Sequence, residues 1–426
     1  MKYAIVTFGC RVNHADSLRI EEDLRARGGV EAPSCDADVV VVNTCSVTAT
    51  ADQGARQAIR RIARANPSAK IVATGCYATR CEDDFAALPV TVVRNSDKLS
   101  FARTLGADPP DGPCGAPVEP GVAGRTAFTI RAQTGCEEQC AYCIIPATRG
   151  ASRSAAIQAL VADVERAAEA GFKEVVVTGV HLGSYGRDLA PAASLLDLLR
   201  ALDRVRGDVT FRVSSLEPMD CTPAIVDFVA GSGRFMPHFH LPLQHASDRV
   251  LAAMRRPYTL GYYRRLVDGI VARLPHASIG SDMLVGFPGE TDADVAANLE
   301  YLPASPLTHL HVFPYSDRPG TAATAMRDKV HGAVIRERAA QLREIGVGLS
   351  RRFRASQAGT VRPGLTLEDG TLVVTDNYLK VRIAPGIARN TRVAVRIPPA
   401  GGDLEVGPTG SVPPAVVRGI AAASTP

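Results

Sequence analysis

The sequence predicts an α/β protein in three parts: an N-terminal βαβ domain with a parallel sheet, a partial (β/α)6 barrel and a small C-terminal β-barrel. Short β-branched runs alternate with helix-length segments up to about residue 100, which is typical of parallel sheets. A stretch rich in Pro and Gly follows, and the alternation then resumes through six further strands. After Gly359 only short strands separated by turns remain. We therefore expect domains at 1–105, 125–354 and 355–399, a linker at 106–124 and a disordered tail at 400–426.

In the N-terminal domain, a cysteine stands just beyond each predicted strand. The strands are expected at residues 4–8, 39–43 and 71–74, with helices at 16–27 and 51–65, and the cysteines are Cys10, Cys45 and Cys76. Ligands of parallel α/β sheets gather at the carboxyl ends of strands, so these three cysteines are expected to converge. Each cysteine could instead be a small buried apolar residue. Cys81, five residues after Cys76, is an alternative third member of the group.

The predicted barrel carries a second group of cysteines. Its strands are expected at residues 127–132, 174–178, 209–214, 238–243, 278–285 and 309–313, and the CxxxCxxC run of Cys136, Cys140 and Cys143 follows the first of them. Three thiolates at this spacing can hold three irons of a [4Fe–4S] cluster and leave the fourth iron open. A zinc site or a disulfide is the alternative, although zinc prefers four ligands and no histidine lies within 30 residues of the run.

The C-terminal third is basic. Residues 327–396 contain fourteen Lys and Arg against six Asp and Glu, and strands are expected there at 372–375, 379–383 and 392–397. A basic β-barrel indicates a polyanionic partner, nucleic acid first, with Lys380 and Arg382 as candidate contacts. The alternative is a solvated surface without a ligand.

Ten cysteines in 426 residues are too few for a disulfide scaffold, and we see neither a signal peptide nor an apolar run long enough to span a membrane. We therefore expect a cytoplasmic protein without membrane association. Cys35, Cys114 and Cys221 receive no role, and the sequence does not give the oligomeric state.

Several motifs occur in the order found in one family. Residues 7–13, 42–48 and 74–78 resemble the N-terminal domain of the radical-SAM (S-adenosylmethionine) methylthiotransferases, and residues 135–150, 282–290 and 313–316 resemble their radical-SAM core. The C-terminal barrel looks like their RNA-binding TRAM domain. The similarity extends from residue 1 to about residue 397.

The resemblance implies two [4Fe–4S] clusters. Cys136, Cys140 and Cys143 would hold the cluster that binds SAM, and Cys10, Cys45 and Cys76 an auxiliary cluster that carries the sulfur. Tyr142, Thr178, Gly179, Ser215 and Glu217 are candidate SAM contacts, although Ser215 and Glu217 could instead cap the helix that starts near Pro218. A low-potential electron donor such as flavodoxin or ferredoxin is implied as a partner.

The resemblance also suggests a substrate. Arg11 and the segments 56–61, 177–186 and 375–382 resemble the subgroup that adds a methylthio group to C2 of N6-threonylcarbamoyladenosine next to the anticodon, which makes the tRNA anticodon stem-loop the expected partner. His181 and Tyr185 in the loop after the second barrel strand are candidate specificity residues, or simply loop packing residues. N6-isopentenyladenosine in tRNA and an aspartate of a ribosomal protein are the alternative targets.

Overall fold

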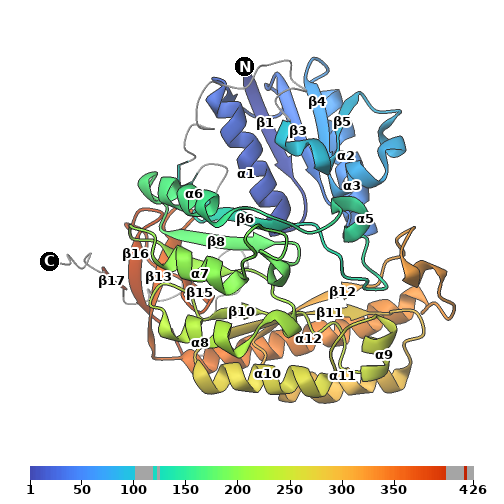
Figure 1. Ribbon diagram of the computed structural model, residues 1–426, viewed down its shortest axis with the longest axis vertical. Coiled ribbons are helices and arrows are strands. Elements are labelled where there is room, and N and C mark those ends of the chain that lie inside the picture. Colours follow the sequence, from blue (N-terminus) through green and yellow to red (C-terminus); the bar gives the residue numbers. More distant parts are fainter. Residues whose placement is uncertain (101–118, 122–124, 400–416, 420–426) are drawn as a thin grey trace.

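The computed structural model describes residues 1–100, 119–121, 125–399 and 417–419. Figure 1 shows three parts: an N-terminal sheet above a barrel, and a small β-domain beside the barrel. Within these residues, every helix is too short or too polar to traverse a lipid bilayer.

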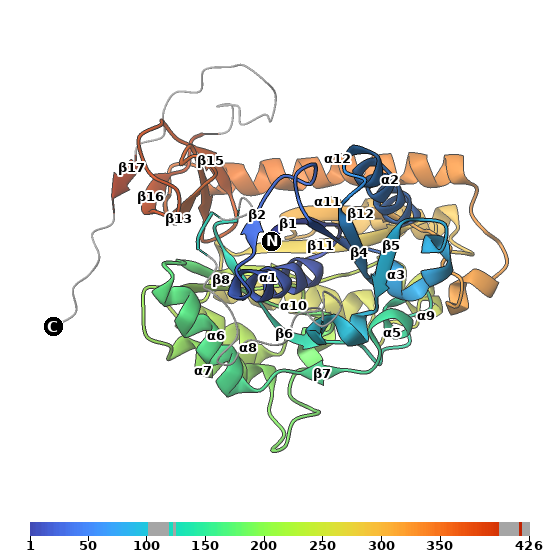
Figure 2. The same cartoon turned by 90° about the horizontal axis from the view of Figure 1, so that it is seen from above.

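The N-terminal part is a five-stranded parallel sheet in the order β2-β1-β3-β4-β5. Its central strand β3 is the run VVVVNT and is buried throughout, as expected for a strand covered by helices on both faces. Ile20 and Leu24 of helix α1 pack on one face, while Ala55 and Ile59 of α2 pack on the other (Figure 2). The elements are β1 (Lys2–Thr7), α1 (Arg11–Ala26), β2 (Val30–Glu31), β3 (Val39–Thr44), α2 (Ala49–Ala65), β4 (Lys70–Gly75), α3 (Cys76–Arg80) and β5 (Val90–Val93).

The barrel consists of two sheets. One has the order β7-β6-β8-β9 and the other is the parallel sheet β10-β11-β12, and the Leu216 amide donates to the His240 carbonyl between them. Its strands are β6 (Phe128–Thr134), β7 (Arg153–Ser154), β8 (Glu174–Gly179), β9 (Thr210–Val213), β10 (His238–His240), β11 (Ser278–Val285) and β12 (His309–Pro314). Its helices are α5 (Ile145–Arg149), α6 (Ile157–Glu169), α7 (Leu195–Asp203), α8 (Pro223–Gly231), α9 (Asp248–Ala253), α10 (Leu260–Arg273) and α11 (Asp292–Ala304). Capping boxes at Ser194 and Thr291 fix where α7 and α11 begin.

The C-terminal part follows helix α12 (Gly332–Gln357), whose 26 residues span about 39 Å and lead from the barrel to the β-domain. This domain is a five-stranded antiparallel sheet in the order β15-β14-β13-β16-β17. Its strands are β13 (Val361–Leu367), β14 (Leu372–Thr375), β15 (Lys380–Arg382), β16 (Arg392–Arg396) and β17 (Val417–Gly419). The α/β class and the three-part architecture predicted from the sequence are confirmed.

Two features of the C-terminal domain differ from the expectation. Strand β13 was not predicted, because Pro363 and Gly364 inside it signal a turn rather than a central strand. Residues 417–419, expected in a disordered tail, form β17 and pair with β16. The rest of that tail and all of the predicted linker except 119–121 lie outside the described residues, as does Cys114.

Candidate metal and substrate site

The structure brings the three N-terminal cysteines together at the carboxyl edge of the sheet. Cys45 lies so close to Gly9 that a Cβ on this glycine would stand 2.6 Å from the Cys45 sulfur. Gly75 has a φ of 99°, and a Cβ there would stand 2.1 Å from the Thr44 carbonyl oxygen. Both positions therefore need glycine, which lets the chain turn sharply just before Cys10 and Cys76.

These cysteines share one electrostatic environment. Burial, together with the neighbouring Cys10 and Cys76, raises the pKa of the Cys45 thiol to about 11 in the metal-free protein. Cys81 stands at the end of α3, where burial raises the pKa of its thiol. That Cys76 rather than Cys81 completes the triad stays a prediction. Elsewhere, Cys35 is exposed and Cys221 is buried in the barrel core.

Arg149 at the end of α5 joins this triad to the barrel. Its Nε donates to the Cys76 sulfur at 3.3 Å, and its Nη2 donates to Asn13 at 2.5 Å and to Asp16 at 3.1 Å. Asn95 makes a second bridge, because its amide contacts the Cys76 sulfur at 3.9 Å and the Thr148 carbonyl oxygen at 3.0 Å. The position of Cys76 is thus set by residues of two domains.

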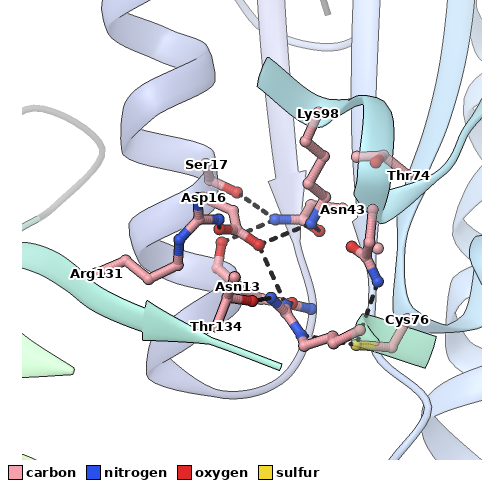
Figure 3. A network of polar contacts seen from close by, with 12 residues as sticks. Asn13, Asp16, Ser17, Asn43, Thr74, Cys76, Lys98, Arg131 and Thr134 are labelled. Atoms are coloured by element: carbon pink, nitrogen blue, oxygen red, sulfur yellow. Dashed lines mark hydrogen bonds and ion pairs between the residues drawn. The ribbon is translucent and has the colours of Figure 1, made fainter. Parts of the chain in front are cut away.

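Asp16 is the centre of this interface. It accepts from Lys98 at 2.8 Å, from Arg149 and from Arg131 of β6 (Figure 3), and its side chain is 1% exposed. Burial opposes ionisation of this carboxyl, but the charges of Lys98, Arg149 and Arg131 outweigh it and hold its pKa well below the usual range. One buried carboxylate thus accepts from three cations at the domain boundary.

The second triad lies in the loop after β6, held by charged residues of the barrel. The amide of Cys143 donates to the Cys140 carbonyl oxygen at 3.1 Å, which closes a tight turn between two of the cysteines. Arg256 donates through Nη1 to the Cys140 sulfur at 2.9 Å and pairs with Glu217 through Nη2. Burial raises the pKa of the Cys143 thiol to about 12, so metal binding here must displace protons. A cationic donor on a sulfur favours the thiolate, which is the form that binds iron.

His181 lies against this triad. Its Nε2 contacts Asp220 at 2.7 Å, and its Nδ1 lies 3.9 Å from the Glu138 carboxylate. Burial opposes protonation of His181, but Asp220 and the nearby Cys136 outweigh it and raise its pKa to about 10. A protonated His181 can therefore donate to Asp220 at neutral pH.

The predicted substrate role of Tyr185 finds no support in its surroundings. Tyr185 is 1% exposed, packs in the barrel core and donates its hydroxyl to the Ala155 carbonyl oxygen at 2.7 Å. His181 is likewise 5% exposed and engaged with Asp220. The alternative of a loop packing residue describes Tyr185 better, and His181 belongs with the cysteine triad.

The candidate SAM residues come from the same loop and from the ends of β8 and β9. Thr178 is buried at the end of β8 and accepts from Ser214, while Gly179 packs against Gln133. Ser215 is exposed, and Glu217 is the partner of Arg256. Tyr142 faces the pocket described next.

A pocket of about 190 Å³ lies between the N-terminal domain and the barrel. Val47 and Thr48, which follow Cys45, line one side, and Tyr142 and Cys143 line another. Arg318 also lines it. A small ligand in this pocket would touch residues adjacent to both cysteine triads.

Arg318 is the cationic group of the pocket wall, which also carries Asp282. It is 4% exposed, and its Nη1 donates to Asp52 of α2 at 2.7 Å. Its Nε and Nη2 have no hydrogen-bond partner among the described residues. A buried guanidinium with two unsatisfied donors is suited to bind a ligand oxygen.

On the C-terminal domain, Lys380 and Arg382 are both exposed and flank the buried Val381, so they share one face of β15. Two other basic residues of this domain contact neighbouring parts of the protein. Arg392 pairs with Asp208 at 2.8 Å, and Arg389 donates to the Gly121 carbonyl oxygen. These two arginines attach the domain to the barrel and to the segment that leads into it.

Several residues of this site were not assigned a role from the sequence. Arg149 and Asp282 stand inside the family motifs, which could have pointed to them. No motif or pattern in the sequence pointed to Asp16, Arg256 or Arg318. Their function depends on contacts between distant segments.

Comparisons with known proteins match both the N-terminal domain and the barrel. Residues 2–93 match the model of Uncharacterized protein family UPF0004, and residues 130–302 match that of the Radical SAM superfamily. The chain is 34% identical to the threonylcarbamoyladenosine tRNA methylthiotransferase MtaB of Aquifex aeolicus, over 90% of this chain and 96% of that protein. It is 33% identical to MtaB of Bacillus subtilis, over 89% of each chain.

Other similar proteins carry different names. A tRNA-2-methylthio-N(6)-dimethylallyladenosine synthase of Parafrankia is 32% identical over 84% of this chain and 76% of that protein. The fold is similar to that of the radical SAM methyltransferase TsrM from Kitasatospora setae, with a TM-score of 0.54 and 17% identity over 76% of this chain and 77% of that chain. Identity above 30% over most of the chain, together with both domain matches, shows that this protein belongs to the radical SAM methylthiotransferase family, whose enzymes use SAM and iron–sulfur clusters.

Proposed function

We propose that this enzyme adds a methylthio group to C2 of N6-threonylcarbamoyladenosine in tRNA. The observation that carries the proposal is the pocket between the two cysteine triads, which offers a nucleobase a place beside both. The names of the relatives from Aquifex and Bacillus support the nucleoside, whereas the Parafrankia relative favours a dimethylallyl substituent as the alternative.

The two triads have different roles in this proposal. Cys136, Cys140 and Cys143 would hold the cluster that binds SAM, while the N-terminal triad would hold the auxiliary cluster. When bound, the first supplies the electron that cleaves SAM, and the second supplies the sulfur. Donor sets of three cysteines, each with an arginine on one sulfur, fit such clusters.

Protein residues around the triads orient and enclose the reaction. Arg256 fixes Cys140 against Glu217, and protonated His181 lies beside Cys136 and pairs with Asp220. Buried contacts between the domains, such as that of Arg318 with Asp52, form part of the pocket wall.

Arg318 and the C-terminal domain would bind the RNA. The two unsatisfied donors of Arg318 point to an oxygen of the nucleoside or its phosphate. Lys380 and Arg382 would contact phosphates of the anticodon stem-loop. A flavodoxin or ferredoxin would deliver the electrons in the cytoplasm.

The direct test uses reconstituted enzyme, SAM, a chemical reductant and two stem-loop RNAs, one with threonylcarbamoyladenosine and one with dimethylallyladenosine. Nucleoside mass spectrometry should find the methylthio product only from the first RNA. Product from the dimethylallyl RNA alone would refute the proposed substrate and leave the family assignment intact.

A further inference from the structure

A cluster of polar and aromatic side chains from the barrel strands β10, β11 and β12 lies where the three domains meet, and its His311 is 57% exposed. It comprises His238 and His240 of β10, Asp282 of β11, His309 and His311 of β12, and Tyr378 from the turn between β14 and β15. Asp282 Oδ1 lies 2.8 Å from His240 Nε2 and 3.2 Å from His311 Nδ1. A Cβ at Gly280 would stand 2.1 Å from His309 Nε2, so this glycine makes room for the histidines.

Arg11 of the N-terminal domain reaches this cluster. Its Nη2 donates to the Tyr378 hydroxyl at 3.0 Å, a contact between residues 367 positions apart. Arg11 has no ion pair within the part of the chain that the structure describes. Arg212, on the same tyrosine ring, is by contrast neutralised by Glu174 at 3.0 Å. Arg11 therefore brings an unbalanced positive charge to the junction.

The cluster and the pocket share Asp282, which lines the pocket together with Cys143. In adenine, C2 and C6 flank N1, and N6 is attached to C6, so a substituent on N6 lies on the same edge of the base as the carbon that is modified. A base whose C2 lies in the pocket therefore brings this substituent within reach of Asp282 in the pocket wall. His311, which contacts Asp282, and Arg11, which reaches the cluster through Tyr378, are the neighbouring polar groups.

The substituents named for the two kinds of relatives differ in chemistry. A dimethylallyl group is a hydrocarbon, whereas a threonylcarbamoyl group carries a carboxylate, a hydroxyl and urea N–H groups. Burying a hydrocarbon against Arg11 would take water from a guanidinium that has no carboxylate partner, which is unfavourable. The polar cluster therefore suits the second substituent.

We propose that Arg11, held by Tyr378, together with Asp282 and His311, forms a subsite that binds the carboxylate-bearing substituent on N6 of the substrate adenosine. Arg11 binds the carboxylate, and the free carboxylate oxygen of Asp282 accepts from the urea or hydroxyl. This inference rests on the proposed function and names the residues that select its substrate. Arg11 and the segment 375–382 are also two of the places where the sequence resembles the threonylcarbamoyladenosine subgroup, and the structure joins them.

The side chains of His240, Asp282 and His311 place ligand atoms within 4.8 Å of one another, which is also compatible with a cation. In the subsite the two histidines instead donate to Asp282, and one carboxylate oxygen remains for substrate. A metal requirement for RNA binding would therefore overturn the proposal.

The test measures binding of unreduced, reconstituted enzyme to three stem-loop RNAs that carry threonylcarbamoyladenosine, dimethylallyladenosine or adenosine at the same position. Wild type should bind the first most tightly. Arg11→Met should lose about tenfold or more of that preference, because a hydrogen bond between two charged groups is removed, while its affinity for the adenosine RNA stays unchanged. Arg19→Met is the matched control from the same helix, since Arg19 is exposed and pairs with Asp163.

Tyr378→Phe is a second, conservative variant, and it changes the residue that the C-terminal domain contributes to the subsite. It removes only the hydroxyl that holds Arg11 and should lower the preference by about threefold, within the range for a single hydrogen bond. Iron content is measured for both variants, because Arg11 follows Cys10 directly, and it should equal that of wild type.

The outcomes separate this subsite from the proposed function. A wild type that shows no preference for the threonylcarbamoyl RNA contradicts the proposed substrate itself. A wild type with the preference, retained in full by both Arg11→Met and Tyr378→Phe, overturns the subsite alone. Loss of the preference in Arg318→Gln but not in Arg11→Met would do the same and place the carboxylate at Arg318.

Discussion

Replacement of Asp16 by asparagine tests whether the domain boundary depends on one buried carboxylate. Asparagine has nearly the same size and keeps an oxygen acceptor, so the change removes mainly the negative charge. Lys98 and Arg149, with side chains 5% and 2% exposed, would then remain buried without a counter-ion. Breaking a buried ion pair in this way costs about 3–5 kcal/mol.

The measurement is urea unfolding of the full-length, metal-free protein at pH 7. With a slope of about 1–3 kcal/mol per molar urea, a loss of 3–5 kcal/mol should move the first transition by more than about 1 M. The matched control is Asp163→Asn, because Asp163 also joins α1 to the barrel through Arg19, but at the surface. An exposed pair contributes less than about 1 kcal/mol, so the control should stay close to wild type.

The pH dependence supplies a second readout. The pKa of Asp16 is lower in the folded protein than the unfolded value of about 3.9, so its stabilisation is complete above that value and is lost as the pH falls through the folded pKa. The difference between wild type and Asp16→Asn should therefore be constant from pH 7 to pH 5 and shrink below about pH 4. Equal transitions for Asp16→Asn and Asp163→Asn at pH 7 would refute the role of Asp16.

Three further predictions concern the clusters and the RNA. Cys140→Ala should abolish reductive cleavage of SAM, whereas Cys45→Ala should retain cleavage but yield no methylthio product; absence of cleavage in folded Cys45→Ala would contradict this division. Cys81→Ala should keep about eight irons per chain, two cubanes in all, and a fall to half would make Cys81 a ligand. Replacing Lys380 and Arg382 by glutamine should make the slope of log binding constant against log salt concentration less negative by about 1.4. This is about 0.7 for each phosphate of single-stranded RNA that is no longer neutralised. An unchanged slope would show that these two side chains are only solvated.

Most strands, and the cysteines that stand just after three of them, could be predicted because their signals are local. β11 was expected at its observed residues, and Cys10, Cys45 and Cys76 each follow a strand that turn residues delimit. β13 was not predicted because its proline and glycine are local signals for a turn. Its pairing with β14 and β16 makes this segment a strand nonetheless. Tertiary pairing outweighs local propensity in such strands.

The interface could not be predicted because its members are far apart in the sequence. Arg149 reaches Asn13 and Cys76 over 136 and 73 residues, and no periodic pattern encodes such a contact. Motifs drew attention to the segment that contains Arg149 without saying what its side chain binds. The chemistry of the site therefore depends on how two domains dock, which the sequence of either domain does not show.

The basic charge of the C-terminal third illustrates the same limit for function. Local composition favoured an RNA-binding surface and included Arg389 and Arg392 among the cations. In the folded protein, Arg389 donates to the Gly121 carbonyl oxygen just before the barrel, and Arg392 pairs with Asp208 of the barrel. Lys380 and Arg382, by contrast, lie on one exposed face of β15. A count of charges thus overstates the number of phosphate contacts, because a guanidinium that docks one domain on another is no longer available to RNA. The salt slope should accordingly reflect two cations on β15 rather than the full basic composition of the domain.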